Sequence, residues 1–171
     1  MNNIEILISE DEINSRVLEI ADAINNKYKN EELLVVGILK GSFVFMSDLI
    51  KRLNMPLEID FMIVSSYSGT ESTGNVNIIK DINNDITNKN ILLVEDIVDT
   101  GLTLSNVRDL LFNRNPKNIE ICTLIDKKVR RKVELEADYV GFNIGNEFII
   151  GYGLDLDEKY RNLPYIGKIV N

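Results

Sequence analysis

The chain has 171 residues, 44% of them hydrophobic and 27% charged, which is the composition of one ordinary globular domain and excludes a disordered chain. The net charge of −8 argues against broad nucleic-acid binding, which needs a cationic surface, but it permits a small anionic ligand held by a few local cations or by a metal. The absence of histidine excludes the usual serine and cysteine triads, so carboxylates, lysine or tyrosine must carry any proton transfer.

The N-terminal part of the chain predicts a helix followed by a strand. Its start, MNNIEILISEDE, is acidic where a signal peptide would be basic, and no apolar run in the chain approaches the ~18–20 residues of a membrane span, so we expect a cytoplasmic protein without a membrane partner. Ser9 and Glu12 have the spacing of a capping box. The apolar run LLVVGIL, 33–39, is typical of a strand buried on both faces. Apolar residues with helical spacing follow the capping box: Ile13, Val17, Ile20, Ala21, Ile24 and Tyr28.

The next segments predict a helix and two strands. KGSFVFMSDLIKRL favours a helix, for which Ser42 is a candidate N-cap. LEIDFMIVSSY, from Leu57, and VNIIK, 76–80, predict strands. SYSGTESTGN, 66–75, has two glycines and almost no apolar residues, so it predicts a loop.

The C-terminal half continues the alternation of strands and helices. ILLVEDI, from Ile91, predicts a buried strand, and the helix after it should bury Leu104, Val107, Leu110 and Leu111. IEICTLI predicts another strand, in which the single cysteine, Cys122, is a buried core thiol. DYVGFNI and EFIIGYG complete the apolar runs. We therefore expect an α/β fold, a mostly parallel central sheet flanked by helices, as one domain over residues 1–171.

The stretch ILLVEDIVDTGLTL, 91–104, combines two kinds of binding group. Ligands collect at the carboxyl ends of parallel strands, so ILLV should bring Glu95 and Asp96 to that edge. Residues 100–103 should form the turn into a helix, where free N–H groups and the helix dipole favour a phosphate and Gly101 permits close approach. Carboxylates accept hydrogen bonds from hydroxyls or hold a divalent cation. A ribose 5-phosphate would satisfy both groups.

The spacing of the carboxylates in this stretch bears on three other interpretations. Spacing alone does not exclude that Glu95, Asp96 and Asp99 are solvated turn residues beside a threonine cap. A phosphatase with an aspartyl nucleophile needs Asp-x-Asp, whereas two residues separate Asp96 from Asp99. A P-loop needs Gly-Lys-Ser/Thr, which is missing.

VEDIVDTGLTL resembles the phosphoribosyl pyrophosphate signature of the type I phosphoribosyltransferases, in the form typical of the hypoxanthine–guanine branch. Six further segments resemble the bacterial hypoxanthine phosphoribosyltransferases in the expected order: VGILKGSF, SSYSGT, LIDKK, DYVGFNI, FIIGYGLD and YRNLPYIG. The resemblance implies the type I phosphoribosyltransferase fold, with a small hood formed by the terminal segments. It also implies transfer of the 5-phosphoribosyl group from phosphoribosyl pyrophosphate to hypoxanthine and/or guanine, with Mg²⁺ as cofactor, by a homo-oligomer (dimer or tetramer).

The resemblance implies roles for the residues of the signature. Glu95 and Asp96 correspond to positions that hold the ribose hydroxyls and help to place the metal. Asp99 corresponds to the general base or acid that handles the proton on the imidazole-ring nitrogen of the purine. The phosphate loop corresponds to the stretch from Asp99 through Thr100, Gly101, Leu102 and Thr103. Some relatives carry a basic residue at position 102, and this chain departs from them with leucine.

Roles around the leaving group are implied in the same way. Lys40 and Gly41 correspond to the pyrophosphate loop, in which the peptide bond before the lysine is cis. Arg161 corresponds to a pyrophosphate contact, although by itself it would be expected to be a surface cation. Ser66 and Tyr67 correspond to the start of a loop that closes over the site and excludes water.

Four residues correspond to purine-binding positions. Phe148 corresponds to the aromatic residue that stacks on the purine, and Ile149 follows where the main chain reads the base edge. Lys127 corresponds to the donor to the exocyclic oxygen, and Asp155 to a second metal position beside the purine. Without the resemblance, Phe148 would be predicted in the core and DKKVRRK as a solvated basic face.

Two alternative functions remain at this point. One is a nucleotide-binding regulator without catalysis that touches RNA through DKKVRRK; the presence of Asp99, Lys127 and Asp155 together argues against it, as does the acidic total charge. The other is a phosphoribosyltransferase for another base, such as xanthine or a pyrimidine. FIIGYGLD and the position of Asp99 favour a 6-oxopurine without choosing between hypoxanthine and guanine.

Overall fold

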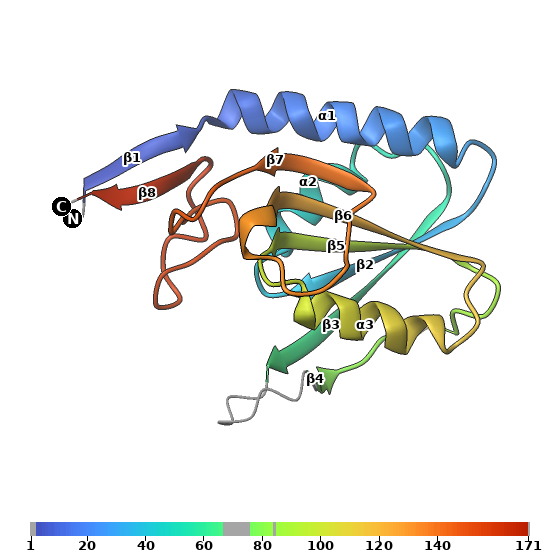
Figure 1. Cartoon of the computed structure of the whole chain (residues 1–171). Helices are drawn as coiled ribbons and strands as arrows, with labels where there is room; N and C mark the ends of the chain where they lie inside the picture. Colours follow the sequence, from blue (N-terminus) through green and yellow to red (C-terminus); the bar gives the residue numbers. More distant parts are fainter. Residues whose placement is uncertain (1–2, 67–75, 84, 171) are drawn as a thin grey trace.

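A computed structural model of the chain describes residues 3–66, 76–83 and 85–170. It confirms the predicted mostly parallel sheet flanked by helices (Figure 1). The elements in chain order are β1 (Asn3–Ile8), α1 (Glu10–Lys27), β2 (Leu33–Leu39), α2 (Phe43–Ile50), β3 (Leu57–Ser66), β4 (Val76–Lys80), β5 (Asn90–Val98), α3 (Leu102–Phe112), β6 (Asn118–Asp126), the 3₁₀ turn η1 (Lys128–Arg130), β7 (Tyr139–Asn143) and β8 (Ile166–Val170).

The main sheet has the strand order β4-β3-β2-β5-β6-β7, and its neighbouring strands are parallel except for the pair β3 and β4. Alternate side chains of its strands point to opposite faces. Leu92 and Val94 of β5 belong to the core under α1 and α2, whereas Ile91 and Leu93 belong to the core under α3. Burial on both faces explains why these strands are uninterrupted apolar runs, and Figure 1 shows the helices on the two faces.

The predicted start of α1 is confirmed. The backbone N–H of Glu12 donates to Ser9 Oγ at 3.3 Å, and that of Ser9 donates to Glu12 Oε2 at 2.8 Å, which completes the capping box. The stripe from Ile13 to Ile24 is buried as predicted, as is Tyr28.

Ser42 occupies the predicted N-cap position of α2, but its side chain makes no capping hydrogen bond. Its hydroxyl donates instead to the carbonyl of Ile38, four residues earlier, at 2.7 Å. Ser42 is completely buried and already has helical dihedral angles, so its side chain turns back onto β2 rather than to the free N–H groups of α2.

The ends of the described chain form a separate two-stranded sheet, in which β1 pairs antiparallel with β8 (Figure 1). Between β7 and β8 the chain is mostly irregular, with isolated bridges such as Gly151 to Leu154. The apolar run EFIIGYG lies here and forms no regular strand. A side chain at Gly151 would meet the Tyr165 carbonyl oxygen at 2.1 Å, and its φ of +98° favours glycine.

Cys122 is fully buried, as predicted, and burial raises the pKa of its thiol. None of the helices in the described ranges combines the length and apolar character that a membrane crossing requires. Of the predicted closing-loop residues, Tyr67 lies outside the described residues, and Ser66 is described only as the last residue of β3.

A buried carboxylate on β6 anchors the end of α1. Glu120 is 4% exposed and accepts hydrogen bonds from the hydroxyls of Tyr28 at 2.7 Å and Tyr139 at 2.9 Å. Lys27 forms an ion pair with the same carboxylate. Burial acts to raise the pKa of Glu120, but these donors outweigh it, and the pKa lies below its ordinary value.

We expect Glu120→Gln to lower the free energy of unfolding at pH 7 by about 1–3 kcal/mol, because neutral Gln forms weaker hydrogen bonds with the same donors. A carboxyl whose pKa is depressed on folding stabilises the native state above its unfolded pKa, and this contribution is lost as pH falls through the folded pKa. The difference between the two proteins should therefore shrink below about pH 4. Urea unfolding at pH 7 and at acidic pH measures it.

Glu19→Gln is the control for this change, because its ion pair with Arg16 is largely exposed and should contribute at most about 1 kcal/mol. An equal loss of stability for Glu120→Gln at every pH would contradict the assigned role of its charge.

Candidate active site

The candidate site lies at the carboxyl ends of β2, β5 and β6, the edge of a parallel sheet at which ligands collect (Figure 1). The chain leaves these strands at Lys40, Asp99 and Lys127. Backbone hydrogen bonds join two of the exits: the N–H of Lys127 donates to the carbonyl of Val98 at 2.9 Å. Segments far apart in the sequence therefore meet at this edge.

The predicted strand ILLVEDI is confirmed as β5, which extends one residue further at each end, to Asn90 and Val98. Val98 pairs with Asp126 of β6, so Glu95 and Asp96 lie in the last four residues of the strand. The helix α3 begins at Leu102, which places Leu102 and Thr103 in its first turn. Pairing with β6 extends β5, and the turn is correspondingly short.

Gly101 occupies the N-cap position of α3 with φ of +81°, a conformation that favours glycine. A Cβ at this residue would lie 2.9 Å from Cδ of Arg131 and 3.1 Å from Cγ2 of Val133. Glycine is therefore required by the turn and by the neighbouring chain. The N–H groups of the first turn of α3 have no carbonyl of a preceding helical turn to bind, which makes this end a favourable place for an anion.

Two adjacent carboxylates, Glu95 and Asp96, lie in β5, just before this turn in the chain. Asp96 is 8% exposed and accepts a hydrogen bond from the N–H of Ile97 at 2.8 Å, and Glu95 is half-buried. Burial raises the pKa of both carboxyls, and the charge of Asp96 raises the pKa of Glu95 further. A cation or hydroxyl donors would therefore be bound favourably between them.

Gly41 packs against this pair. A Cβ at Gly41 would lie 1.6 Å from Oδ2 of Asp96, and a Cβ at Gly153 would lie 2.1 Å from the carbonyl oxygen of Gly41. The backbone at Gly41 thus approaches the Asp96 carboxylate, and the backbone at Gly153 approaches that of Gly41, more closely than side chains at these positions would permit. The predicted cis bond between Leu39 and Lys40 is present.

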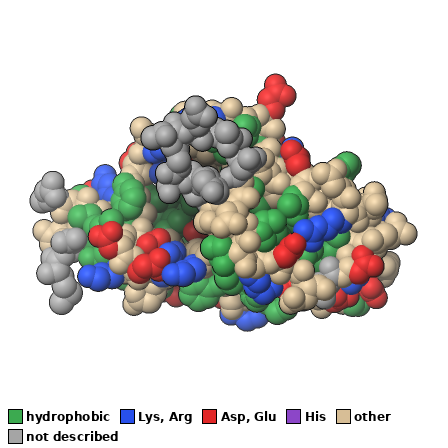
Figure 2. Space-filling view, turned by 90° about the horizontal axis from the view of Figure 1, so that it is seen from below, with side chains coloured by type: hydrophobic (Ala, Val, Ile, Leu, Met, Phe, Trp, Pro, Cys, Tyr) green, Lys and Arg blue, Asp and Glu red, His purple; other side chains and the backbone are tan. Residues whose placement is uncertain are grey.

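Charged side chains of both signs surround this contact. Arg161 Nη2 lies 2.8 Å from Asp155 Oδ1, and Arg161 Nη1 donates to the Gly153 carbonyl at 2.7 Å. Lys40 Nζ lies 3.0 Å from Glu158 Oε2. With a side chain only 20% exposed, Arg161 is not the plain surface cation that its position alone predicted. In the view from below, acidic and basic side chains lie next to one another on the surface (Figure 2).

Asp99 follows β5, and 39% of its side chain is exposed, although its Oδ1 is buried. Its Oδ1 is 2.8 Å from Nε of Arg130, and its backbone carbonyl accepts a hydrogen bond from Arg131 Nη1 at 3.0 Å. The carboxylate is thus partly accessible while its backbone is fixed.

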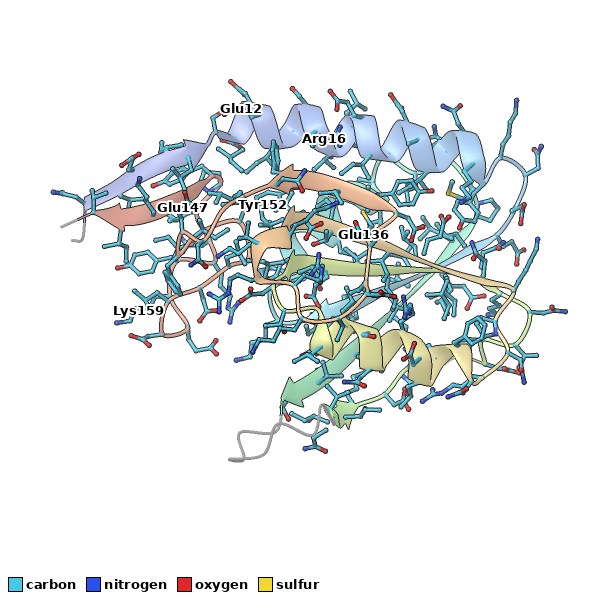
Figure 3. All side chains as sticks on the ribbon, viewed as in Figure 1. Glu12, Arg16, Glu136, Glu147, Tyr152 and Lys159 are labelled. Carbon is cyan, nitrogen blue, oxygen red and sulfur yellow. The ribbon has the colours of Figure 1, made fainter. Side chains whose placement is uncertain are left out.

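The predicted purine-binding residues differ in exposure. Lys127 is 5% exposed, and its Nζ donates to the carbonyl of Glu147 at 2.6 Å, so DKKVRRK is not solvated throughout. Phe148 is 59% exposed and Ile149 is 4% exposed. The exposed phenylalanine departs from the core position expected without the resemblance. Glu147, next to Phe148, lies between β7 and β8 (Figure 3).

Within the described ranges, no three His, Cys, Asp or Glu side chains come close enough to hold a metal by themselves. Asp155 does not join Glu95 and Asp96, since its oxygens face Arg161 and the N–H of Glu158. The pair of Glu95 and Asp96 alone suits Mg²⁺, which typically takes one or two carboxylates and completes its shell with water and substrate phosphates.

Arg130 and Arg131 were missed as site residues by the sequence interpretation. Both lie in DKKVRRK, which was interpreted as a solvated basic face or an RNA contact, and both contact Asp99. Their signal was the position of this basic run directly after the strand β6. Glu158 and Gly153 carried no comparable signal, because an irregular segment brings them to the site.

A cavity of about 410 Å³ lies at the opposite edge of the sheet, lined in part by Glu31, Pro56 and Glu58. Its lysines are already paired, Lys89 with Glu58 and Lys117 with Glu31. It is remote from the carboxyl ends of the strands and from the residues described above.

Comparisons with known proteins agree with this geometry. Residues 9–157 match the family model of the phosphoribosyl transferase domain. A hypoxanthine phosphoribosyltransferase of Buchnera aphidicola subsp. Schizaphis graminum is 51% identical over 99% of this chain and 97% of its own length.

Solved structures are similar over the same extent. A hypoxanthine phosphoribosyltransferase of Staphylococcus aureus has a TM-score of 0.94 at 52% identity, covering 97% of this chain and 91% of its own. A hypoxanthine-guanine phosphoribosyltransferase of Bacillus anthracis, with a HEPES molecule in its active site, has a TM-score of 0.95 at 49% identity, covering 99% and 100%. The sequence motifs, the fold and these similarities together establish that the chain belongs to the phosphoribosyl transferase domain family.

Proposed function

We propose that this chain transfers the 5-phosphoribosyl group of phosphoribosyl pyrophosphate to hypoxanthine, guanine or both, in purine salvage. The observation that carries the proposal is the contact of Gly41 with Asp96 and Gly153, which joins the segments assigned to pyrophosphate, ribose and purine in one site. The names and near full-length identity of the relatives support the same reaction.

In this proposal the turn from Asp99 to Thr103 binds the 5′-phosphate through backbone N–H groups at the start of α3. Glu95 and Asp96 accept hydrogen bonds from the ribose hydroxyls and would hold Mg²⁺. Mg²⁺, when bound, neutralises charge that develops on the pyrophosphate. Leu102 in place of a basic residue is compatible with this binding, since the backbone makes the contact.

The pyrophosphate lies in this proposal between the backbone of Lys40 and Gly41 and the guanidinium of Arg161. Lys40 and Arg161 supply positive charge to the leaving group, and both are now paired with acidic neighbours, Glu158 and Asp155. An incoming polyanion would replace those carboxylates as the partner of the two cations. Asp155, released from Arg161, is then free to take part in the second metal position.

Asp99 is proposed as the group that accepts the purine proton and makes the attacking nitrogen more nucleophilic. The partial exposure of its carboxylate, with Oδ1 beside Arg130, supports this role. For the purine itself, we propose that Phe148 stacks on the ring, Lys127 donates to the exocyclic oxygen and the backbone at Ile149 reads the base edge. The exposure of Phe148 and the burial of the Lys127 ammonium support this division.

The proposal also includes a hood, a closing loop, an oligomeric state and a cellular location. The β1–β8 sheet and the irregular segment before it form the hood, and a loop that starts at Ser66 and Tyr67 closes over the site. The chain forms a homo-oligomer, for which the half-exposed Phe43 and Ile59, on the face of the sheet that carries α1 and α2, offer apolar contact area. A cytoplasmic location suits a chain whose one cysteine has no partner within it.

The test of the proposal is a pyrophosphate-release assay with phosphoribosyl pyrophosphate, Mg²⁺ and each purine in turn. We expect release with hypoxanthine or guanine, at a rate that exceeds the rate with xanthine or a pyrimidine. Release with xanthine alone would support the alternative substrate, and binding of nucleotides without release would support a regulator.

We expect Phe148→Ala to raise the KM for the purine about tenfold or more, because stacking on an aromatic side chain contributes roughly 1–3 kcal/mol per base. The KM for phosphoribosyl pyrophosphate should change little. Phe112→Ala is the matched control, since Phe112 is a 68% exposed phenylalanine at the end of α3. Steady-state kinetics with each substrate varied in turn measure both effects, and an unchanged purine KM would mean that the base binds elsewhere.

A further inference from the structure

The segment 127–132, which contains η1, holds the backbone of the phosphate turn. Three successive carbonyls of the turn accept hydrogen bonds from it. The pairs are the N–H of Lys127 with Val98 O at 2.9 Å, Nη1 of Arg131 with Asp99 O at 3.0 Å, and the N–H of Lys132 with Thr100 O at 2.9 Å. In each planar trans peptide the C=O and the following N–H point in opposite directions. The N–H groups of residues 99–101 therefore point away from this segment.

Arg131 supplies the one side-chain contact of the three. Its side chain is 12% exposed and forms an ion pair with Asp126, the last residue of β6, which is completely buried. The other Asp126 oxygen has no hydrogen-bond partner among the described residues, so this carboxylate depends on Arg131. The aliphatic part of Arg131 also lies against Gly101. The guanidinium thus bridges the end of β6 and the turn after β5.

We propose that Arg131 is a positioning residue for the 5′-phosphate: by binding Asp99 O it fixes the peptide whose N–H, that of Thr100, points toward the phosphate. The inference rests on the proposed function and deepens it. Arg131 touches no substrate in this account. A lysine cannot replace it, because one ammonium on a shorter stem cannot bridge Asp126 and Asp99 O as the planar fork does.

Loss of the Arg131 contact should weaken binding of the 5′-phosphate more than binding of the purine. Lys127, the proposed purine donor, is held through its own backbone N–H and through its Nζ on the Glu147 carbonyl, and neither bond involves Arg131. Loss of the Arg131 contact therefore leaves Lys127 in place and reaches the purine only through Asp99, whose displacement would lower kcat rather than raise the purine KM. General damage to the fold would raise the KM of both substrates.

The experiment compares Arg131→Lys with Arg108→Lys, a control on α3 whose arginine pairs only with the exposed Asp109 among the described residues. We expect Arg131→Lys to raise the KM for phosphoribosyl pyrophosphate and the Kd for ribose 5-phosphate about tenfold, the effect of losing one charge-assisted hydrogen bond. The purine KM should stay within about twofold of the wild-type value, because the bonds that hold Lys127, the proposed purine donor, do not involve Arg131. Kinetics, titration calorimetry and thermal unfolding are measured on the three proteins.

A second variant, Asp126→Asn with Arg131→Gln, keeps the test decisive if Arg131→Lys does not fold, because it removes both buried charges together. Wild-type affinity for ribose 5-phosphate in either folded variant would overturn the inference, as would equal losses for both substrates. The calorimetric measurement needs no turnover, so a wild-type protein that releases no pyrophosphate would refute the proposed function while the role of Arg131 is still decided by ribose 5-phosphate binding.

Discussion

Asp99→Asn should lower kcat by about a hundredfold to ten-thousandfold, the range that a positioned general base contributes. The amide keeps the size of the side chain but cannot accept the purine proton. The ion pair between Asp99 and Arg130 is half-exposed, so its loss should cost little stability, at most about 1 kcal/mol. The KM for phosphoribosyl pyrophosphate should change far less than kcat, since the backbone of Asp99, held by Arg131, is unaffected.

Asp109→Asn controls for the loss of one negative charge, at a position near the end of α3. Asp109 pairs with Arg108 on the surface of the helix, and its replacement should leave both parameters close to wild type. Stopped-flow or steady-state measurement of pyrophosphate release gives kcat, with both substrates varied. The opposite result for Asp99→Asn, a higher KM for phosphoribosyl pyrophosphate at unchanged kcat, would refute the assigned role.

Gly41→Ala should lower kcat/KM about a hundredfold, the effect of displacing reacting groups by about 1 Å. The added Cβ would lie 1.6 Å from the Asp96 carboxylate, and that carboxylate is buried and bonded to the N–H of Ile97, so it cannot turn aside without losing this bond. Either the pyrophosphate loop or the ribose-binding acid must move. Both lie at the centre of the proposed site.

Gly145→Ala is the matched change, because its Cβ would also meet a carboxylate, that of Glu147, at 2.9 Å. Glu147 is exposed and flexible at its end, so it can move away, and activity should be retained. Kinetics of both variants, with circular dichroism to verify folding, make the comparison. Wild-type kcat/KM in folded Gly41→Ala would show that the contact of Gly41 with Asp96 does not matter for the reaction.

The sequence patterns predicted the fold well where one physical rule dominates. Strands such as 33–39 are buried on both faces and must be apolar, and the helix after Ser9 has both a capping box and a complete stripe. At Ser42 the pattern predicted the N-cap position but not the side-chain contact, because a hydroxyl that can reach the free N–H groups of a helix can equally reach a carbonyl four residues back. The strand predicted from ILLVEDI agrees with β5 to within one residue at either end.

Local sequence patterns could predict only part of the candidate site. The turn around Gly101 has local requirements, namely a positive φ and a helix start, and these leave a local signature. The positions of Lys127 and Phe148 do not, because their burial and exposure depend on where the irregular chain before β8 lies. Lysine is usually exposed and phenylalanine usually buried in proteins, but here Lys127 is buried and Phe148 is exposed. The resemblance, not the local pattern, pointed to them.

The most direct test of the account is a crystal structure with a bound purine mononucleotide. The account predicts the 5′-phosphate at the backbone N–H groups of residues 100–103, the ribose hydroxyls beside Glu95 and Asp96, and the base against Phe148. A nucleotide whose phosphate lies away from this turn, for example at the opposite edge of the sheet, would contradict it.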